Sequence, residues 1–308
     1  MSESLSRSVP GVTDLPGFAG LVTPAGSVQR AAAPAVRDVW RVELGPGPAD
    51  AVDPRLRQYF VDMLAAAGER FDEPLYTRGK RNSFADLMAA LLAARSPQDL
   101  DLVVLAHSLP DCDPCICTAG SVQDHPGTPM TFAIGDMGVA APFVAVTAAH
   151  AYHAPPECSR ILVAMLDQST LPYAEPAVGG VGGDHAVAIR LASDGAAVLG
   201  PVRGHIGVAP DAVAEQLAAE LEELVGADGC TLIAGNGVAP VHRPHSGVTV
   251  LTCAADQPAT GPWSVLADGW PHWRGRRRRV VIADYEPDRG YLCVLPIDFD
   301  PARAHGER

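Results

Sequence analysis

The amino-acid sequence predicts a protein of the α/β class. Amphipathic helical segments alternate with short, continuously apolar segments, as in the helix expected from Ser83 and the run 101–107 that follows it. A helix leading into an uninterrupted apolar strand is typical of parallel sheets that are covered on both faces. The alternation begins again after Gly207, so the second half of the chain repeats the order of the first without repeating its sequence.

Each expected element follows from its hydrophobic period or its end signals. Residues 38–44 alternate apolar and polar side chains with the period of two of a strand. Asp53 and Pro54 open a helix, because proline fits the first turn, and Pro142 must lie near the start of a helix over about 137–153. The other expected strands are 131–134, 161–166, 185–191, 196–199, 230–234, 248–253, 280–285 and 291–297, and a further helix is expected at 211–225.

Composition excludes several classes of function. The chain has 308 residues with a formal net charge of −13, which argues against a nucleic-acid binder because phosphate contacts need a cationic surface. The arginine-rich run 274–279 is either a solvated loop or a docking site for an acidic partner. The apolar stretch 138–149 is too short to cross a bilayer, and residues 1–17 have no signal-peptide pattern. We therefore expect a cytoplasmic protein without membrane contact.

Seven cysteines in such a chain predict reduced thiols. Cys112, Cys115 and Cys117 cluster near His107, but no second pair of ligands completes a tetrahedral set nearby. We expect no metal and no cofactor.

Five motifs, in order and spacing, resemble the type III ketoacyl synthases. The segment Asp101-Leu-Val-Val-Leu-Ala-His-Ser108 is similar to the family's D-L-V-V-x-A-T-S strand, and 131–138 lies over its strand and nucleophile elbow. In the second half, 232–238 is similar to V-P-H-Q-A-N and 258–264 to G-N-T-S-A-A-S. Gly182-Gly-Asp-His-Ala-Val187 is a degraded form of the glycine-rich G-D-G-A-G-A turn.

The resemblance places Gly138, Gly235 and Ala259 at the catalytic cysteine, histidine and asparagine of the family. None of the three offers a nucleophile or a side-chain donor, so the normal condensation should be lost. The resemblance implies a thiolase-type five-layer αβαβα fold of two similar βαβαβαββ halves, 1–207 and 208–308. It also implies a dimer, with 131–134 as the edge strand that pairs across the two-fold axis.

Some residues near the positions of the missing catalytic groups have side chains that could act in catalysis. Asp136 either has a raised pKa in an apolar pocket or caps the next helix. The adjacent residues Asp184 and His185 are candidates for an acid–base pair. Because neighbours on a strand point to opposite faces, a structural role is the alternative. Asn236 returns to the site if the alignment slips by one residue.

Other side chains are candidates for lining a substrate pocket. Met137, Cys117 and Trp263 are the substrate-binding candidates, although core packing is the alternative for Trp263 and its neighbours Trp270 and Trp273. His242 and His245 lie in the loop that replaces the family's next helix.

Two functions remain open. The first is a ketosynthase-like pseudoenzyme of a specialised polyketide or fatty-acyl pathway, without condensing activity. It would bind an acyl-CoA or acyl carrier protein thioester, as a homodimer or as a heterodimer with an active ketosynthase. The second is a diverged acyltransferase, cyclase or thioester hydrolase that uses residues other than cysteine. A pocket filled by Met137 and the tryptophans would favour the first.

Overall fold

Eleven strands form one hydrogen-bonded sheet in the part of the chain that the computed structural model describes, residues 33–47, 51–123, 129–173, 182–226, 229–240 and 245–304. Their order is β3-β2-β4-β5-β1-β6-β11-β10-β8-β9, and β7 pairs with β11. The strands are β1 (Ala35–Leu44), β2 (Leu102–His107), β3 (Met130–Ile134), β4 (Ile161–Asp167), β5 (Asp184–Ala192), β6 (Ala197–Leu199), β7 (Arg203–His205), β8 (Cys230–Ala234), β9 (Val248–Thr252), β10 (Arg278–Glu286) and β11 (Tyr291–Phe299).

The sheet repeats one pairing pattern twice. Strand β2 is parallel to β3 and β4, and β8 is parallel to β9 and β10. The antiparallel pair β4–β5 corresponds to β10–β11, and the pairing of β1 with β6 joins the two sets. The duplication expected from the order of elements is therefore real, although the boundary near residue 207 stays a prediction.

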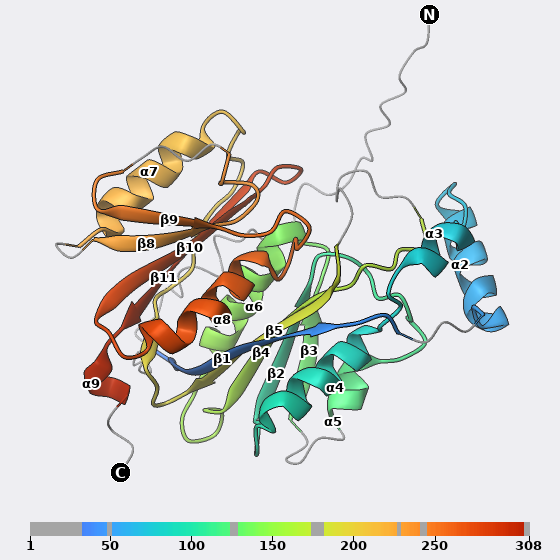
Figure 1. Ribbon diagram of the computed structural model, residues 1–308, viewed down its shortest axis with the longest axis horizontal. Coiled ribbons are helices and arrows are strands. Elements are labelled where there is room, and N and C mark those ends of the chain that lie inside the picture. The colour runs from blue at the N-terminus through green and yellow to red at the C-terminus, as the bar shows by residue number, and fades with distance from the viewer. Residues whose placement is uncertain are drawn as a thin grey trace, which may run out of the picture.

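Helices divide the molecule into layers (Figure 1). Helices α6 (Ala141–Tyr152) and α8 (Gly261–Trp273) lie in the middle, where one hydrophobic core joins them to strands of both halves. Helix α4 (Phe84–Arg95) packs on the outer face of the first half, and α7 (Val213–Leu224) on that of the second. This is the five-layer αβαβα arrangement. The remaining helices are α2 (Pro54–Ala66), α3 (Glu73–Arg78), α5 (Thr118–Gln123), η1 (Gly138–Ala140) and α9 (Pro301–Ala304).

Local signals in the sequence start the helices where expected. The Asp53 side chain accepts hydrogen bonds from the first N–H groups of α2, and Pro54 is its first residue. Ser83 and Asp86 form a reciprocal capping box at the start of α4. Pro142 lies in the first turn of α6, where it removes no helical hydrogen bond.

Tryptophans fill the central layer. Trp263 is 1% exposed and packs on Phe143 of α6, with ring centroids 5.3 Å apart. Trp270 and Trp273 both pack on Phe299 of β11. The Trp263–Phe143 contact therefore joins the two halves, while the other two tryptophans fix α8 against β11.

Short elements escaped the sequence prediction. Helices α3 and α5 and strand β7 have only three to six residues each, too few for a hydrophobic period to emerge. The helix expected over about 137–153 is divided into η1 and α6. Helices α2 and α3 lie beyond the end of the sheet (Figure 1) and enclose a small core of their own, around Phe60 and Tyr76.

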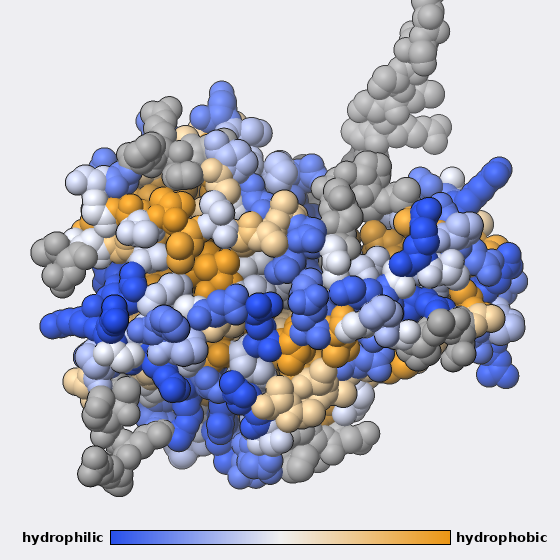
Figure 2. Space-filling view, viewed as in Figure 1, coloured by the Kyte–Doolittle hydropathy of each residue, from blue (hydrophilic) through white to orange (hydrophobic). Residues whose placement is uncertain are grey.

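The two edges of the sheet, β3 and β9, carry apolar side chains. On β3, Met130 is 47% exposed, and Phe132 contacts Tyr152, which is 46% exposed. Figure 2 shows hydrophobic side chains gathered over β9, between α7 and α8, on a face that is otherwise largely hydrophilic. Among the described residues, no helix has the length and hydropathy needed to span a bilayer.

Candidate active site

The first of the three aligned positions is a glycine in a left-handed turn. Gly138 follows β3 with φ of +53°, and its carbonyl accepts a hydrogen bond from Ser108 Oγ at 2.9 Å. A Cβ atom built on Gly138 collides with Oε2 of Glu286, at the end of β10. The same Oε2 accepts the backbone N–H of Val139 at 2.9 Å. A buried carboxylate thus occupies the space that any side chain at position 138 would need.

The second position shows the same replacement. Gly235 follows β8, and a Cβ there collides with the carboxylate of Asp284 on β10. Oδ1 of Asp284 accepts the N–H groups of Gly237 and Tyr285 at 2.9 and 2.8 Å. Burial, with a contribution from the charge of Glu286, raises the pKa of Asp284 to about 7.

At the third position a carboxylate binds the backbone and does not occupy side-chain space. The backbone N–H of Ala259 lies 3.0 Å from Oδ2 of Asp167, the last residue of β4. The N–H and the hydroxyl of Thr260 donate to the same oxygen, both at 2.7 Å. Burial raises the pKa of Asp167 to about 6, despite these hydrogen bonds, which lower it.

These contacts cross between the halves. Asp167 belongs to the first half and binds the N–H groups just before α8 of the second. Glu286 belongs to the second half and binds an N–H of η1, which leads into α6 of the first. Strands β4 and β10 are equivalent in the repeated pattern, so the two halves exchange carboxylates. The N-terminal end of a helix carries positive potential and exposed N–H donors, which stabilise such anions.

These three acids were not predicted from the sequence. Asp167 and Glu286 end apolar strands and Asp284 lies two residues before such an end, where acids normally face solvent. Only the fold shows that all three are buried. One signal was present: Asp284 and Glu286 are two residues apart on a strand and therefore share a face.

Among the predicted site residues, Asp136 lies in neither of its expected settings. Asp136 is exposed with φ of +58° and gives η1 no side-chain cap. Burial lowers the pKa of the nearby His107, and the charge of Asp136 partly opposes that shift. Both settings expected for Asp136, an apolar pocket and a helix cap, are therefore wrong.

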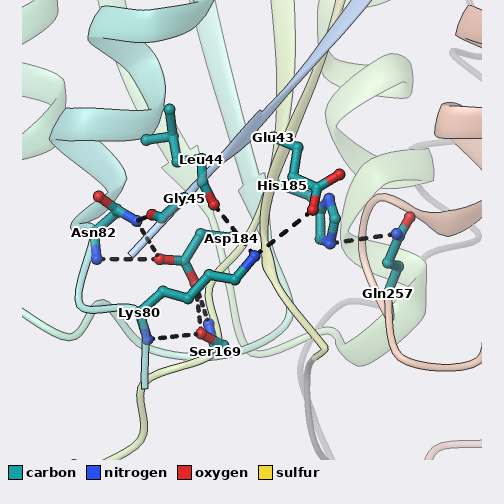
Figure 3. A network of polar contacts seen from close by, with 9 residues as sticks. All are labelled: Glu43, Leu44, Gly45, Lys80, Asn82, Ser169, Asp184, His185 and Gln257. Carbon is teal, nitrogen blue, oxygen red and sulfur yellow. Dashed lines mark hydrogen bonds and ion pairs between the residues drawn. The ribbon is translucent and has the colours of Figure 1, made fainter. Parts of the chain in front are cut away.

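The pair on β5 splits, as neighbours on a strand should (Figure 3). The Asp184 carboxylate is fully buried and accepts hydrogen bonds from Asn82 and Ser169, which is a structural role. His185 lies across from Asp167 in the β4–β5 ladder and contacts Gln257, with 3.4 Å between the two Nε2 atoms. Burial lowers the pKa of His185.

The Asn236 side chain joins two turns of the backbone. Its Nδ2 donates to the carbonyls of Ala254 and Ala255 at 3.2 and 3.1 Å. Cys253 lies against it, with Sγ 3.5 Å from Oδ1. Asn236 therefore ties the turn after β8 to the turn after β9.

The proposed pocket residues do not form one group. Met137 is half-buried against the central core, and Trp263 is inside that core. Cys117 is exposed at the start of α5, where its sulfur accepts the N–H of Gly120. His245 contacts the carbonyl of Ser246, and His242 lies outside the described residues. Among the described residues, no group of three or more His, Cys, Asp or Glu side chains is arranged to hold a metal ion.

The arginine-rich run lies at the opposite end of β10 from Glu286. Arg278 stacks on Trp273 and Arg279 pairs with Asp298, so both have structural partners. Arg274, Arg276 and Arg277 are exposed. Because β10 has nine residues, a partner docked there would be roughly 26 Å from the elbow, at about 3.3 Å per residue.

Comparisons with known proteins now define the fold. No protein-family model and no curated protein matches the sequence. Among solved structures, the chain is similar to AbyA1, a tetronic acid condensing enzyme, with 17% identity and a TM-score of 0.57 over 86% of this chain and 99% of that one. It has the thiolase fold.

Two further condensing enzymes agree. The 3-oxoacyl-(acyl carrier protein) synthase III FabH of Pseudomonas aeruginosa has 14% identity and a TM-score of 0.52, over 88% of this chain and 99% of that one. A variant of OleA from Xanthomonas campestris, with bound lauric acid and lauroyl-CoA, has 14% identity and a TM-score of 0.56, over 87% and 99%. The thiolase-type fold expected from the motifs is confirmed, and at this identity the likeness concerns the fold alone.

Replacing Gly138 by alanine tests the occupied elbow. We expect G138A to lower the free energy of unfolding by more than G68A, because Gly68 also has a left-handed φ but nothing lies within 4 Å of its Cβ position. In a double-mutant cycle measured by urea denaturation, the double variant G138A/E286A should be more stable than the sum of the two single effects predicts, by about 1 kcal/mol or more. Additive effects of the two substitutions would contradict the collision.

The raised pKa of Asp284 makes stability depend on pH. Unfolded, this carboxyl ionises near pH 4, at its ordinary pKa of about 3.9, whereas folded it keeps its proton up to about pH 7. The folded state therefore binds more protons between these values, and its stability falls as pH rises from about 4 to about 7.

The variant D284N removes this titration and keeps an oxygen for the two N–H groups. We subtract the free energy of unfolding of wild type from that of D284N at each pH. We expect this difference to rise by at least about 1 kcal/mol from pH 4 to pH 8. Urea denaturation across that range measures the change, and the exposed Asp288, as D288N, is the control. Parallel pH profiles of D284N and wild type would contradict the raised pKa.

Proposed function

We propose that this chain is a ketosynthase-like protein that binds acyl thioesters but does not condense them. The observation that carries the proposal is the set of three buried carboxylates, Glu286, Asp284 and Asp167, beside the positions of the family's cysteine, histidine and asparagine. The solved structures that share the fold include condensing enzymes, one of them bound to lauroyl-CoA. An acyl-CoA or acyl carrier protein thioester is therefore the proposed ligand, within a specialised biosynthetic pathway.

Electrostatics makes condensation unfavourable in such a site. Claisen condensation builds negative charge on a thioester oxygen and on an enolate, and the family stabilises it with hydrogen-bond donors. In their ionised forms, which Asp167 and Asp284 reach above about pH 6 and pH 7, these carboxylates repel that charge. The repulsion is about 4 kcal/mol for two unit charges 4 Å apart at an effective dielectric constant of 20. Neither Gly235 nor Ala259 adds a side-chain donor, and Gly138 adds no thiol.

A cytoplasmic location is part of the proposal. All seven cysteines are free thiols in the structure, among them the exposed Cys115 and Cys117. Such thiols persist in a reducing compartment.

The absence of condensation is directly testable. We expect no β-ketoacyl product above the uncatalysed blank when the protein is incubated with acyl- and malonyl-thioesters, followed by mass spectrometry with an active type III synthase as positive control. A non-hydrolysable acyl thioether of CoA should raise the melting temperature, because a ligand of the folded state stabilises it. A β-ketoacyl product, or decarboxylation of the malonyl group, would contradict the proposal.

We also propose that β3 pairs with β3 of a second copy of this chain. The strand is at the edge of the sheet, and Met130, Phe132 and Tyr152 form an apolar surface beside it. An unpaired apolar edge is unfavourable in water, and antiparallel pairing across a two-fold axis satisfies its backbone groups.

A charge at this edge tests the pairing. We expect wild type to have the mass of a dimer in sedimentation experiments and M130K to shift toward the monomer at the same concentration. The matched control is I206K, because Ile206 is 51% exposed and follows β7 on the other half of the sheet. A monomeric wild type, or equal masses for the two variants, would contradict pairing through β3.

A further inference from the structure

We propose that Glu286 is a carboxylate nucleophile, which accepts the acyl group of a bound thioester and passes it to water. The inference rests on the proposed binding of acyl thioesters and gives this site an activity of its own.

The position of the carboxylate supports this role. Oε2 of Glu286 lies where a Cβ of residue 138 would lie, and it accepts the N–H of Val139 at 2.9 Å. Only glycine leaves that space open, so Gly138 and Glu286 are complementary. Ser108 fixes the turn from the other side through the carbonyl of Gly138. The carboxylate is therefore preorganised at the elbow, where a thioester bound as the fold implies would present its carbonyl carbon.

The site lies close to the surface of the molecule. Glu286 is 8% exposed, but the residues that follow it, 287–289, are exposed, as is Asp136 at the start of the elbow. Residues 137–139 are half-buried. Glu286 thus lies one layer below the surface.

The first step is an acyl transfer without any change in oxidation state. Oε2 attacks the thioester carbonyl carbon, a carbon–oxygen bond forms, and the carbon–sulfur bond breaks. The products are a mixed anhydride on Glu286 and a thiolate. The anhydride is more reactive than the thioester, so it does not accumulate and must be trapped.

The second step uses the neighbouring acid. Asp284 shares the face of β10 with Glu286, and its two backbone hydrogen bonds both go to Oδ1. Oδ2 is therefore the oxygen that takes a proton from the attacking water. The water oxygen bonds to the acyl carbon, the anhydride bond breaks, and the Glu286 carboxylate is restored. Asp284 then gives up this proton, through solvent, to the thiolate released in the first step. The net reaction converts a thioester and water into a carboxylic acid and a thiol.

The experiment measures thiol release from a short acyl-CoA, with hydroxylamine present in a parallel sample. We expect wild type to release thiol and to acquire a hydroxamate on Glu286, found by peptide mass spectrometry. E286Q keeps an oxygen for the N–H of Val139 but places its NH₂ group near the N–H of Asp288, which lies 3.4 Å from Oε1 in wild type. It should therefore fold with at most a small fall in melting temperature and lose about 100-fold or more of the rate. E223Q, on an exposed glutamate of α7, should retain the rate.

Three results would overturn the inference. One is an undiminished rate in E286Q, and another is thiol release without a hydroxamate on Glu286. The third is stabilisation by the acyl thioether of CoA without any thiol release, which would leave the proposed binding function intact. Because condensation is read from a β-ketoacyl product and hydrolysis from thiol alone, the two proposals fail separately.

Discussion

Two buried carboxylates hold the centre of this molecule together. Asp167 and Glu286 each leave one half of the sheet and bind N–H groups at the start of the other half's central helix. Those N–H groups have no partner within their own helix, so each contact satisfies donors that would otherwise be buried at a cost. The position of α6 against α8, and the tryptophan-rich core between the two halves of the sheet, depend on this exchange.

The same exchange explains why the site looks as it does. Small residues at 138 and 235 are required because the acids of β10 occupy the adjoining space. Glycine at 138 and 235 and the buried acids of β10 therefore form a matched set. At the third position, Asp167 binds the backbone N–H groups of Ala259 and Thr260 instead of occupying side-chain space.

Most of the fold could be predicted because its signals are local. The strand 230–234 was predicted to the residue, and the helix starts at Asp53 and Ser83 follow from capping chemistry. The three acids could not be predicted, since their burial depends on contacts far apart in the sequence. Glu286 meets Val139 across 147 positions, and Asp167 meets Ala259 across 92. The resemblance to type III synthases located the glycines and the alanine, but it could not show what faces them.

The left-handed glycine at the elbow also limits which substitutions the chain tolerates there. A cysteine at position 138 would place its Cβ against the carboxylate of Glu286, in a backbone conformation that side chains rarely adopt. Removing Glu286 first leaves the N–H of Val139 without its acceptor. Either order passes through a weakened intermediate, so Gly138 and Glu286 constrain each other and change at least cost together.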